Sequence, residues 1–219
     1  KFNYDRILVV GMGGSGVAGD VLKLILNKYS PLDIEVHKTY KITKKHIENK
    51  PLCLFISYSG NTEETVSALE DAIKADLEWC VISSGGTLLE MAKKNGKPYI
   101  EVPSGLQPRA AFGLMTKAVA NFTPESLGVN VEQNCKDSGI YLNELLHNES
   151  ENEIIKITKE IANNIGNKTV IIYGGTQLSY LVSQRWKTQI NENAKSKSYV
   201  GYMPEVHHNE ILSWEADKD

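Results

Sequence analysis

The sequence contains no run of apolar residues as long as the roughly 18 that a membrane-spanning helix requires, and it has no excess of basic residues. Its 24 lysines and arginines are outnumbered by 27 aspartates and glutamates, so the formal charge is −3. Proteins that bind nucleic-acid backbones or anionic membranes without sequence preference need a basic surface. We therefore expect neither a nucleic-acid partner nor a membrane partner.

Cysteine is also scarce. Cys53, Cys80 and Cys135 are odd in number and lack the paired spacing of a zinc site. Cys53 and Cys80 fall inside apolar runs, where a buried thiol behaves as a small hydrophobic side chain. The start at Lys1 shows no secretory leader, so we expect a reducing, cytoplasmic protein without a disulfide framework. The missing initiator methionine indicates either processing or a piece of a longer polypeptide.

The first third of the chain alternates strand signals with helix signals. A short aliphatic run typical of a strand buried on both faces occurs at residues 6–10, and further strands are expected at 34–36, 52–56, 79–82 and 98–102. Helical spacing of apolar residues occurs at 17–28, 63–74 and 88–95. This alternation predicts a parallel sheet whose strands are joined by right-handed helical crossovers.

The rest of the chain predicts a helical middle and a return of the first pattern. Helices are expected at 110–121, 134–146 and 151–165; a strand at 169–173 then enters two glycines, and a helix follows at 178–194. The 219 residues correspond to about one and a half domains at roughly 150 residues each. We expect an α/β fold of two doubly wound, three-layer parallel-sheet domains, the second incomplete, with limits 1–122 and 165–219 and a helical connection at 123–164.

The first candidate site is the glycine-rich turn Gly11-Met12-Gly13-Gly14-Ser15-Gly16, which follows a strand and opens a helix. Such a turn offers free backbone N–H groups and a positive helix end to an anion. The spacing also fits a dinucleotide fingerprint, but Glu35 lies within the next strand rather than at its end. A P-loop is excluded because no Gly-Lys-Ser/Thr follows. A tight strand-to-helix turn without a ligand is the alternative.

The second candidate site is Ser57-Tyr58-Ser59-Gly60-Asn61-Thr62-Glu63-Glu64, at the end of one buried strand and the start of a helix. Serine and threonine are good helix caps, and acidic residues suit a first turn, so capping alone is one interpretation. Two hydroxyl-rich helix starts in one sheet favour more than capping. Together they can surround a phosphate monoester with hydroxyl and N–H donors, without a lysine or a metal.

This pattern, Ser-x-Ser-Gly-x-Thr-x-Glu after Gly-Gly-Ser-Gly, resembles the sugar isomerase (SIS) family of phosphosugar-binding domains. Three further segments, at residues 103–113, 191–195 and 204–211, are similar to the bifunctional phosphoglucose/phosphomannose isomerases within that family. The resemblance spans essentially the whole chain. It implies two SIS-type domains, a metal-independent enzyme without a cofactor, and conversion of glucose 6-phosphate and mannose 6-phosphate to fructose 6-phosphate through a cis-enediolate.

The resemblance also assigns roles to particular residues. The phosphate would be held by residues of the two hydroxyl-rich turns, namely Gly14, Ser15, Ser57, Ser59 and Thr62. Arg109 would stabilise the enediolate; a surface arginine is the alternative, although a cation at a helix start is unfavourable to the helix dipole. Glu205 would be the proton-shuttling base, with its pKa raised by a dry pocket.

His208 is a candidate for opening the sugar ring, or a positioning group together with His207. The resemblance implies a ring-opening histidine further downstream, supplied by a neighbouring subunit, and a lysine near the C-terminus of family members. A homodimer is therefore expected. Adjacent histidines can indicate a metal, but no third ligand has convincing spacing, so we expect none.

Three other functions stay open at this point. A non-catalytic SIS sensor of phosphosugars would need the phosphate site but no base, so Arg109 and Glu205 distinguish it from an enzyme. Amidotransfer to a sugar phosphate would need a glutaminase domain with an N-terminal cysteine nucleophile, and a dehydrogenase would need the dinucleotide fingerprint. Arg185, Lys187, Asn191 and Glu192 share one predicted helix; they either line a domain interface or form a solvated face.

Overall fold

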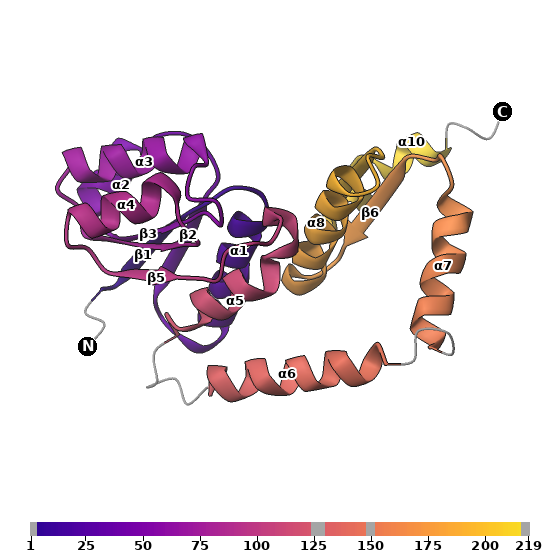
Figure 1. The fold of residues 1–219 in the computed structure, drawn as a ribbon. Coiled ribbons are helices and arrows are strands. Elements are labelled where there is room, and N and C mark those ends of the chain that lie inside the picture. The colour runs from indigo at the N-terminus through magenta and orange to yellow at the C-terminus, as the bar shows by residue number, and fades with distance from the viewer. Residues whose placement is uncertain (1–3, 124–129, 148–151, 216–219) are drawn as a thin grey trace. The chain divides into compact units, whose positions relative to one another are not determined.

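In the computed structural model, residues 4–123, 130–147 and 152–215 are described. They divide into two compact units, residues 1–129 (unit 1) and 130–219 (unit 2), which are shown in Figure 1. Along the part of the chain that is described, no helix has both the length and the apolar character needed to cross a membrane.

Unit 1 is built on a five-stranded, fully parallel sheet in the order β2-β1-β3-β4-β5. The strands are β1 (Arg6–Val10), β2 (Asp33–His37), β3 (Leu52–Ile56), β4 (Trp79–Ser83) and β5 (Tyr99–Glu101). The strand order reverses between β1 and β3, which lie side by side, with Val9 opposite Leu54. In doubly wound sheets, ligands bind outside the carboxyl ends of the strands at this reversal.

Helices cover both faces of this sheet and complete three layers (Figure 1). They are α1 (Gly13–Tyr29), α2 (Lys44–Asn49), α3 (Glu63–Lys74), α4 (Gly86–Lys94) and α5 (Phe112–Ala120). Side chains alternate along each strand, so Ile7 and Val9 pack with α1 and α5 while Leu8 and Val10 pack with α3 and α4. These two cores confirm the buried strand predicted at residues 6–10, whereas the edge strand β5 exposes Tyr99 and Glu101.

Unit 2 contains a two-stranded parallel sheet of β6 (Val170–Gly174) and β7 (Ser198–Tyr202). Its helices are α6 (Val131–Leu145), α7 (Glu153–Ile165), α8 (Gln177–Glu192), α9 (Glu205–His208) and α10 (Ile211–Glu215). The strand–glycine–helix repeat predicted at residues 169–194 is confirmed by β6 and α8. Glu151, the first residue of one predicted helix, lies outside the described residues.

Candidate functional site

The loop that joins β3 to α3 carries three hydroxyl side chains at the sheet's reversal point. Ser57 Oγ lies 2.8 Å from Thr62 Oγ1 and 3.5 Å from Ser59 Oγ. Ser57 is buried, Thr62 is half-buried and Ser59 is exposed, so the group leads from the sheet to the surface. Thr62 occupies the N-cap position of α3, yet its side chain makes no capping hydrogen bond. The capping-only interpretation therefore fails for Thr62.

The glycine-rich turn brings a second helix start to the same loop. Gly14 and Ser15 lie in the first turn of α1, whose N-cap, Met12, also provides no side-chain cap. The first N–H groups of a helix have no intrahelical partner and can bind an anion. Ser15 Oγ accepts a hydrogen bond of 3.3 Å from the N–H of Tyr58. The structure thus brings Ser15 together with the loop that contains Ser57 and Ser59.

Close backbone contacts hold the β3–α3 loop in place. Gly60 has a φ of +72°, and a Cβ atom there would lie 1.8 Å from the carbonyl oxygen of Gly85. The carbonyl oxygen of Tyr58 accepts the N–H of Ser84 at 2.9 Å and its hydroxyl at 2.6 Å. Only glycine can occupy position 60 under these conditions. The loop is therefore fixed against the start of α4.

Charged side chains of both signs surround these turns. Glu63 and Glu64 open α3, and their negative charges raise the pKa of the Tyr40 hydroxyl. Lys38 follows β2; a Cβ atom on Gly16 would lie 3.2 Å from its Cε atom, and its ammonium group pairs with Asp20. Sequence reasoning missed Lys38. Its position one residue after a predicted strand, at the carboxyl edge of the sheet, could have indicated it.

Arg109 lies in unit 1, in the 3-10 helix η1 (Pro108–Ala110), which follows β5 and packs against α1. Pro108 occupies the first turn of η1, as the sequence predicts for a helix start. The Arg109 side chain is half-buried. A fully solvated surface arginine is therefore not what the structure shows.

Glu205 and His208 lie in unit 2, on the short helix α9 that follows the carboxyl end of β7. Both side chains are exposed, and Glu205 Oε1 accepts a hydrogen bond of 2.7 Å from the Asn209 amide. The described residues of unit 2 do not by themselves enclose Glu205. The dry pocket expected around this carboxylate stays a prediction.

Two further carboxylates of unit 2 were not assigned roles from the sequence. Glu210 is half-buried and accepts a hydrogen bond of 2.6 Å from the Tyr173 hydroxyl, which raises the pKa of that tyrosine. Burial lowers the pKa of Arg185, and the charge of Glu192, the last residue of α8, opposes this effect only in part. Because α8 runs back between two parallel strands, Glu192 lies at the edge of the sheet opposite Glu205.

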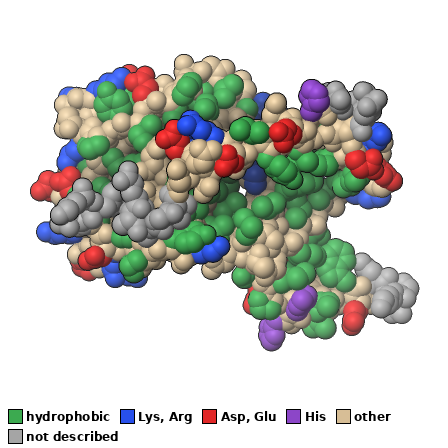
Figure 2. Space-filling model, turned by 90° about the horizontal axis from the view of Figure 1, so that it is seen from below, with side chains coloured by type: hydrophobic (Ala, Val, Ile, Leu, Met, Phe, Trp, Pro, Cys, Tyr) green, Lys and Arg blue, Asp and Glu red, His purple; other side chains and the backbone are tan. Residues whose placement is uncertain are grey.

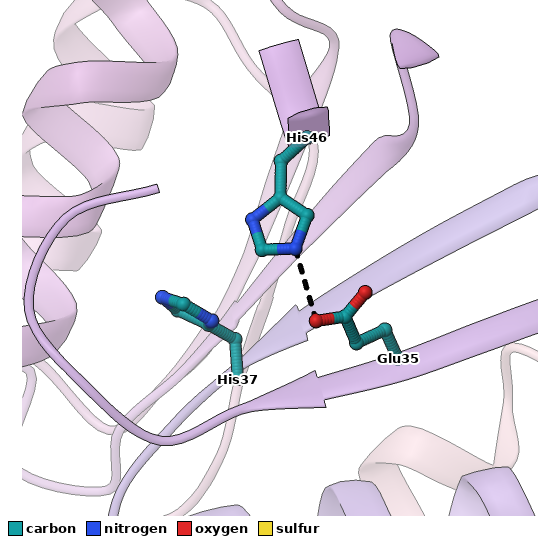
Figure 3. Close-up of side chains that lie close together, drawn as sticks. All are labelled: Glu35, His37 and His46. Atoms are coloured by element: carbon teal, nitrogen blue, oxygen red, sulfur yellow. Dashed lines mark hydrogen bonds and ion pairs between the residues drawn. The ribbon is translucent and has the colours of Figure 1, made fainter. Parts of the chain in front are cut away.

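Glu35, His37 and His46 of unit 1 place three potential metal-ligand atoms within 4.8 Å of one another (Figure 3). Their hydrogen bonds argue against a metal. His46 Nδ1 accepts the N–H of Thr43 at 3.3 Å, and its Nε2 lies 2.9 Å from Glu35 Oε1. Since a backbone N–H can only donate, the His46 proton sits on Nε2, the atom that a metal would need. The cluster therefore fits a structural hydrogen-bond network.

A cavity of about 90 Å³ lies beside this cluster. Its lining includes Arg6, Asp33 and Pro51, which stand at the amino ends of β1, β2 and β3. It is thus at the edge of the sheet opposite the hydroxyl loop. Glu35 lies in the middle of β2 and contacts His46, which removes the acidic residue that a dinucleotide site would need at the strand end.

Two family models match the chain in the regions where these elements lie. Residues 2–90 match the SIS domain, and residues 155–219 match the bacterial phospho-glucose isomerase C-terminal SIS domain. Both matched regions belong to the SIS domain family. This confirms the resemblance inferred from the two hydroxyl-rich turns, and the SIS domain match contains both of them.

Curated relatives of this SIS chain are longer than it is. A bifunctional phosphoglucose/phosphomannose isomerase of Caldicellulosiruptor bescii is 34% identical over 99% of this chain and 64% of its own length. The enzyme of that name from Aquifex aeolicus is 38% identical over 96% and 62%. A D-glucosamine-6-phosphate 4-epimerase of Sulfolobus acidocaldarius is 33% identical over 94% and 63%. The chain thus spans slightly under two thirds of these relatives.

Solved structures share the fold at low identity. The tagatose-6-phosphate ketose/aldose isomerase of Escherichia coli aligns with 96% of this SIS chain and 60% of its own, with a TM-score of 0.65 and 16% identity. At this identity the likeness concerns the fold alone. It confirms the predicted class, an α/β protein with SIS-type parallel sheets.

Proposed function

We propose that the chain is the phosphosugar-binding and proton-transferring part of an aldose–ketose isomerase. Its substrates would be glucose 6-phosphate and mannose 6-phosphate, both converted to fructose 6-phosphate. The observation that carries this proposal is the group of hydroxyls on Ser57, Ser59 and Thr62, with Ser15 bonded to the same loop. Two uncapped helix starts meet there at the reversal of the sheet, where a phosphate dianion gains N–H and hydroxyl donors.

Phosphate binding in this proposal requires neither a metal nor a nucleotide. Gly14 and Ser15 offer the N–H groups of the α1 start, and the loop offers its hydroxyl groups. The acidic first turn of α3 opposes a dianion, and the Lys38 ammonium beside α1, which is paired with Asp20, offsets this repulsion only in part. Hydrogen bonds to an ionised oxygen contribute roughly 1.5–3 kcal/mol each, so several of them outweigh this screened repulsion.

The isomerisation step needs a base between C1 and C2 and a cation for the enediolate oxygen. Arg109 is our candidate for the cation. Glu205 is our candidate for the base, and Glu192, in the second segment that carries the resemblance, is the comparison to be tested with it. His208 is proposed to move the proton that opens the sugar ring. Glu205 and Glu192 lie at opposite edges of the sheet. Replacing each of them in turn therefore distinguishes which carboxylate acts as the base.

Two other functions would use the same phosphate site. A phosphosugar sensor would use the hydroxyl loop without any base. The similarity to a D-glucosamine-6-phosphate 4-epimerase makes epimerisation of an amino-sugar phosphate the second candidate. It would bind the substrate phosphate in the same way, but the reaction would take place at carbon 4 instead of carbons 1 and 2.

We also propose that the protein is a cytoplasmic homodimer with domain limits 1–122, 123–164 and 165–219. Supporting the dimer, Figure 2 shows hydrophobic side chains gathered on the surface of unit 2. On α7 they are Ile154, Ile157 and Ile161, which are exposed and share one helix face. Apolar faces of this kind mark interaction sites. The free thiols of Cys53, Cys80 and Cys135 suit a reducing compartment.

The test compares turnover in the wild type, Glu205→Gln and Glu192→Gln with fructose 6-phosphate as the substrate. We expect Glu205→Gln to lower kcat by at least about a hundredfold, since a positioned general base contributes typically 10²–10⁴-fold. KM should change little. The reverse pattern, with Glu192→Gln inactive and Glu205→Gln normal, would move the base to Glu192. A wild type that binds the sugar phosphate but converts none would favour the sensor, and epimerisation of glucosamine 6-phosphate would favour the second candidate.

A further inference from the structure

Tyr58 lies between Ser57 and Ser59, and its hydroxyl group makes hydrogen bonds that have no role in the proposed reaction itself. Its side chain is only 4% exposed. The hydroxyl group donates to the carbonyl oxygen of Pro103 and accepts from the N–H of Leu106, each at 3.0 Å. A phenol spends its one proton and one lone pair on these contacts. The ring therefore ties the segment 103–106 to the hydroxyl loop.

Both backbone groups of Tyr58, the N–H and the carbonyl oxygen, are also hydrogen-bonded. Its N–H donates to Ser15 Oγ, and its carbonyl oxygen accepts from the N–H and the hydroxyl of Ser84. One residue thus joins the segments that follow β1, β4 and β5 to the segment that follows β3. The backbone contacts would form with any residue at position 58, whereas the contacts with Pro103 and Leu106 require the tyrosine hydroxyl.

The segment held by Tyr58 leads directly to Arg109. Leu106 is followed by Gln107 and then by η1, whose second residue is Arg109. Gly105 lies inside the clamped segment with a φ of +99°, a conformation that side-chain-bearing residues rarely adopt. The two hydrogen bonds to Tyr58 bracket this turn. They set where the chain leaves the sheet on its way to the arginine.

We propose that Tyr58 is a positioning residue that couples phosphate binding to the placement of Arg109. The proposal rests on the proposed function. A phosphate held by Ser57 and Ser59 restricts the motion of Tyr58 between them. Through its hydrogen bonds to Pro103 and Leu106, the Tyr58 hydroxyl then restricts the motion of residues 103–109. Loss of the hydroxyl leaves the Pro103 carbonyl and the Leu106 N–H without their partner, so the segment loosens while the phosphate donors stay in place.

The test uses Tyr58→Phe, which keeps the ring, and Tyr29→Phe as the matched control on the exposed end of α1. We expect kcat for fructose 6-phosphate to fall between about tenfold and a hundredfold in Tyr58→Phe, because a misplacement of about 1 Å costs on that order. KM and the affinity for inorganic phosphate should stay within about twofold of the wild type. In an Arg109→Ala background, Tyr58→Phe should have almost no further effect on kcat, since coupled residues are not additive.

A second measurement does not depend on activity, and its first part uses the wild type alone. In the wild type, hydrogen exchange at the Leu106 amide should slow when inorganic phosphate is added, and in folded Tyr58→Phe this amide should exchange faster. If phosphate leaves Leu106 exchange unchanged, the coupling does not exist. A fully active Tyr58→Phe enzyme, or one that loses phosphate affinity as much as kcat, also overturns the proposal. If the exchange effects are present but the wild type converts no sugar phosphate, it is the proposed function that fails.

Discussion

Ser57 Oγ lies at the centre of the hydroxyl group, within hydrogen-bond reach of Thr62 and Ser59 and accepting the N–H of Gly60 at 3.2 Å. Its side chain is buried, so few other partners compete for it. A phosphate oxygen that displaces the Thr62 contact would receive a charge-assisted hydrogen bond, which is stronger than the neutral one it replaces.

Replacing Ser57 by alanine tests this site at the scale of one atom. We expect Ser57→Ala to raise KM for fructose 6-phosphate by roughly 10- to 100-fold, the equivalent of one lost hydrogen bond of about 1.5–3 kcal/mol to an ionised group. The control is Ser67→Ala, on the half-buried side of α3, which should match the wild type. Steady-state kinetics decides; equal KM values in the two variants would remove Ser57 from the phosphate site.

Cys53 and Cys80 give a prediction about reactivity. Burial raises the pKa of each thiol from 9.0 to about 12. We expect a thiol-specific reagent at pH 8 to label only the half-buried Cys135 in the native protein and all three cysteines after unfolding. Since the folded state holds these protons more tightly, the contribution to stability is intact below pH 9 and is lost as the pH rises towards 12. Rapid native labelling of all three cysteines would contradict the burial.

Residue roles could be predicted from the sequence only where a local pattern encodes them. The hydroxyl triplet is read directly from Ser57 to Thr62. Lys38 was not identified from the sequence, because it lies near α1 only once β1 and β2 pair in the sheet. The surroundings of Glu205 could not be predicted, since enclosure depends on whatever packs over α9 and no local spacing encodes that.

At the scale of elements, the β3–α3 loop is held by its fit against the β4–α4 loop. Gly60 is the tightest point, with its positive φ and the Gly85 carbonyl where a Cβ would be. The N–H of Leu88 also donates to the Gly60 carbonyl oxygen at 3.0 Å. The proposed phosphate donors are thus positioned by backbone packing between two loops rather than by side chains alone.

We expect Gly60→Ala to lower the free energy of unfolding by more than about 2 kcal/mol, since the left-handed conformation alone costs roughly 1–2 kcal/mol. Gly113→Ala is the matched control: Gly113 lies in α5 with open space around its Cα. That change should stabilise the protein by about 0.5–1 kcal/mol because alanine favours helices. Urea unfolding of both variants checks the contrast, and a Gly60→Ala variant as stable as the wild type would refute the close fit.

Elements with strong periodicity were predicted well. The strand at 52–56 and the helix at 63–74 match β3 and α3 residue for residue. The helix α2 was missed because its six residues hold one aliphatic side chain, and His46 replaces the acidic residue usual in a capping box. β7 was missed because Gly201 interrupts a five-residue run that includes three polar or aromatic positions.

At the scale of the molecule, the alternation of strands and helices was enough to predict a parallel sheet, but not its order. The reversal between β1 and β3 is what places Ser15 beside the loop of Ser57 and Ser59, although 42 residues separate Ser15 from Ser57 in the chain. Of the residues proposed to carry the reaction, Arg109 belongs to unit 1 and Glu205 belongs to unit 2. No local sequence pattern encodes such long-range placements.

The most direct test of sugar-phosphate isomerisation is to incubate the purified wild-type chain with fructose 6-phosphate and to quantify glucose 6-phosphate and mannose 6-phosphate separately. We expect both products to form without added metal or nucleotide, in amounts proportional to protein concentration. Unphosphorylated fructose should give neither. Formation of neither aldose phosphate at substrate concentrations that saturate binding would contradict the proposal that these residues carry out an aldose–ketose isomerisation.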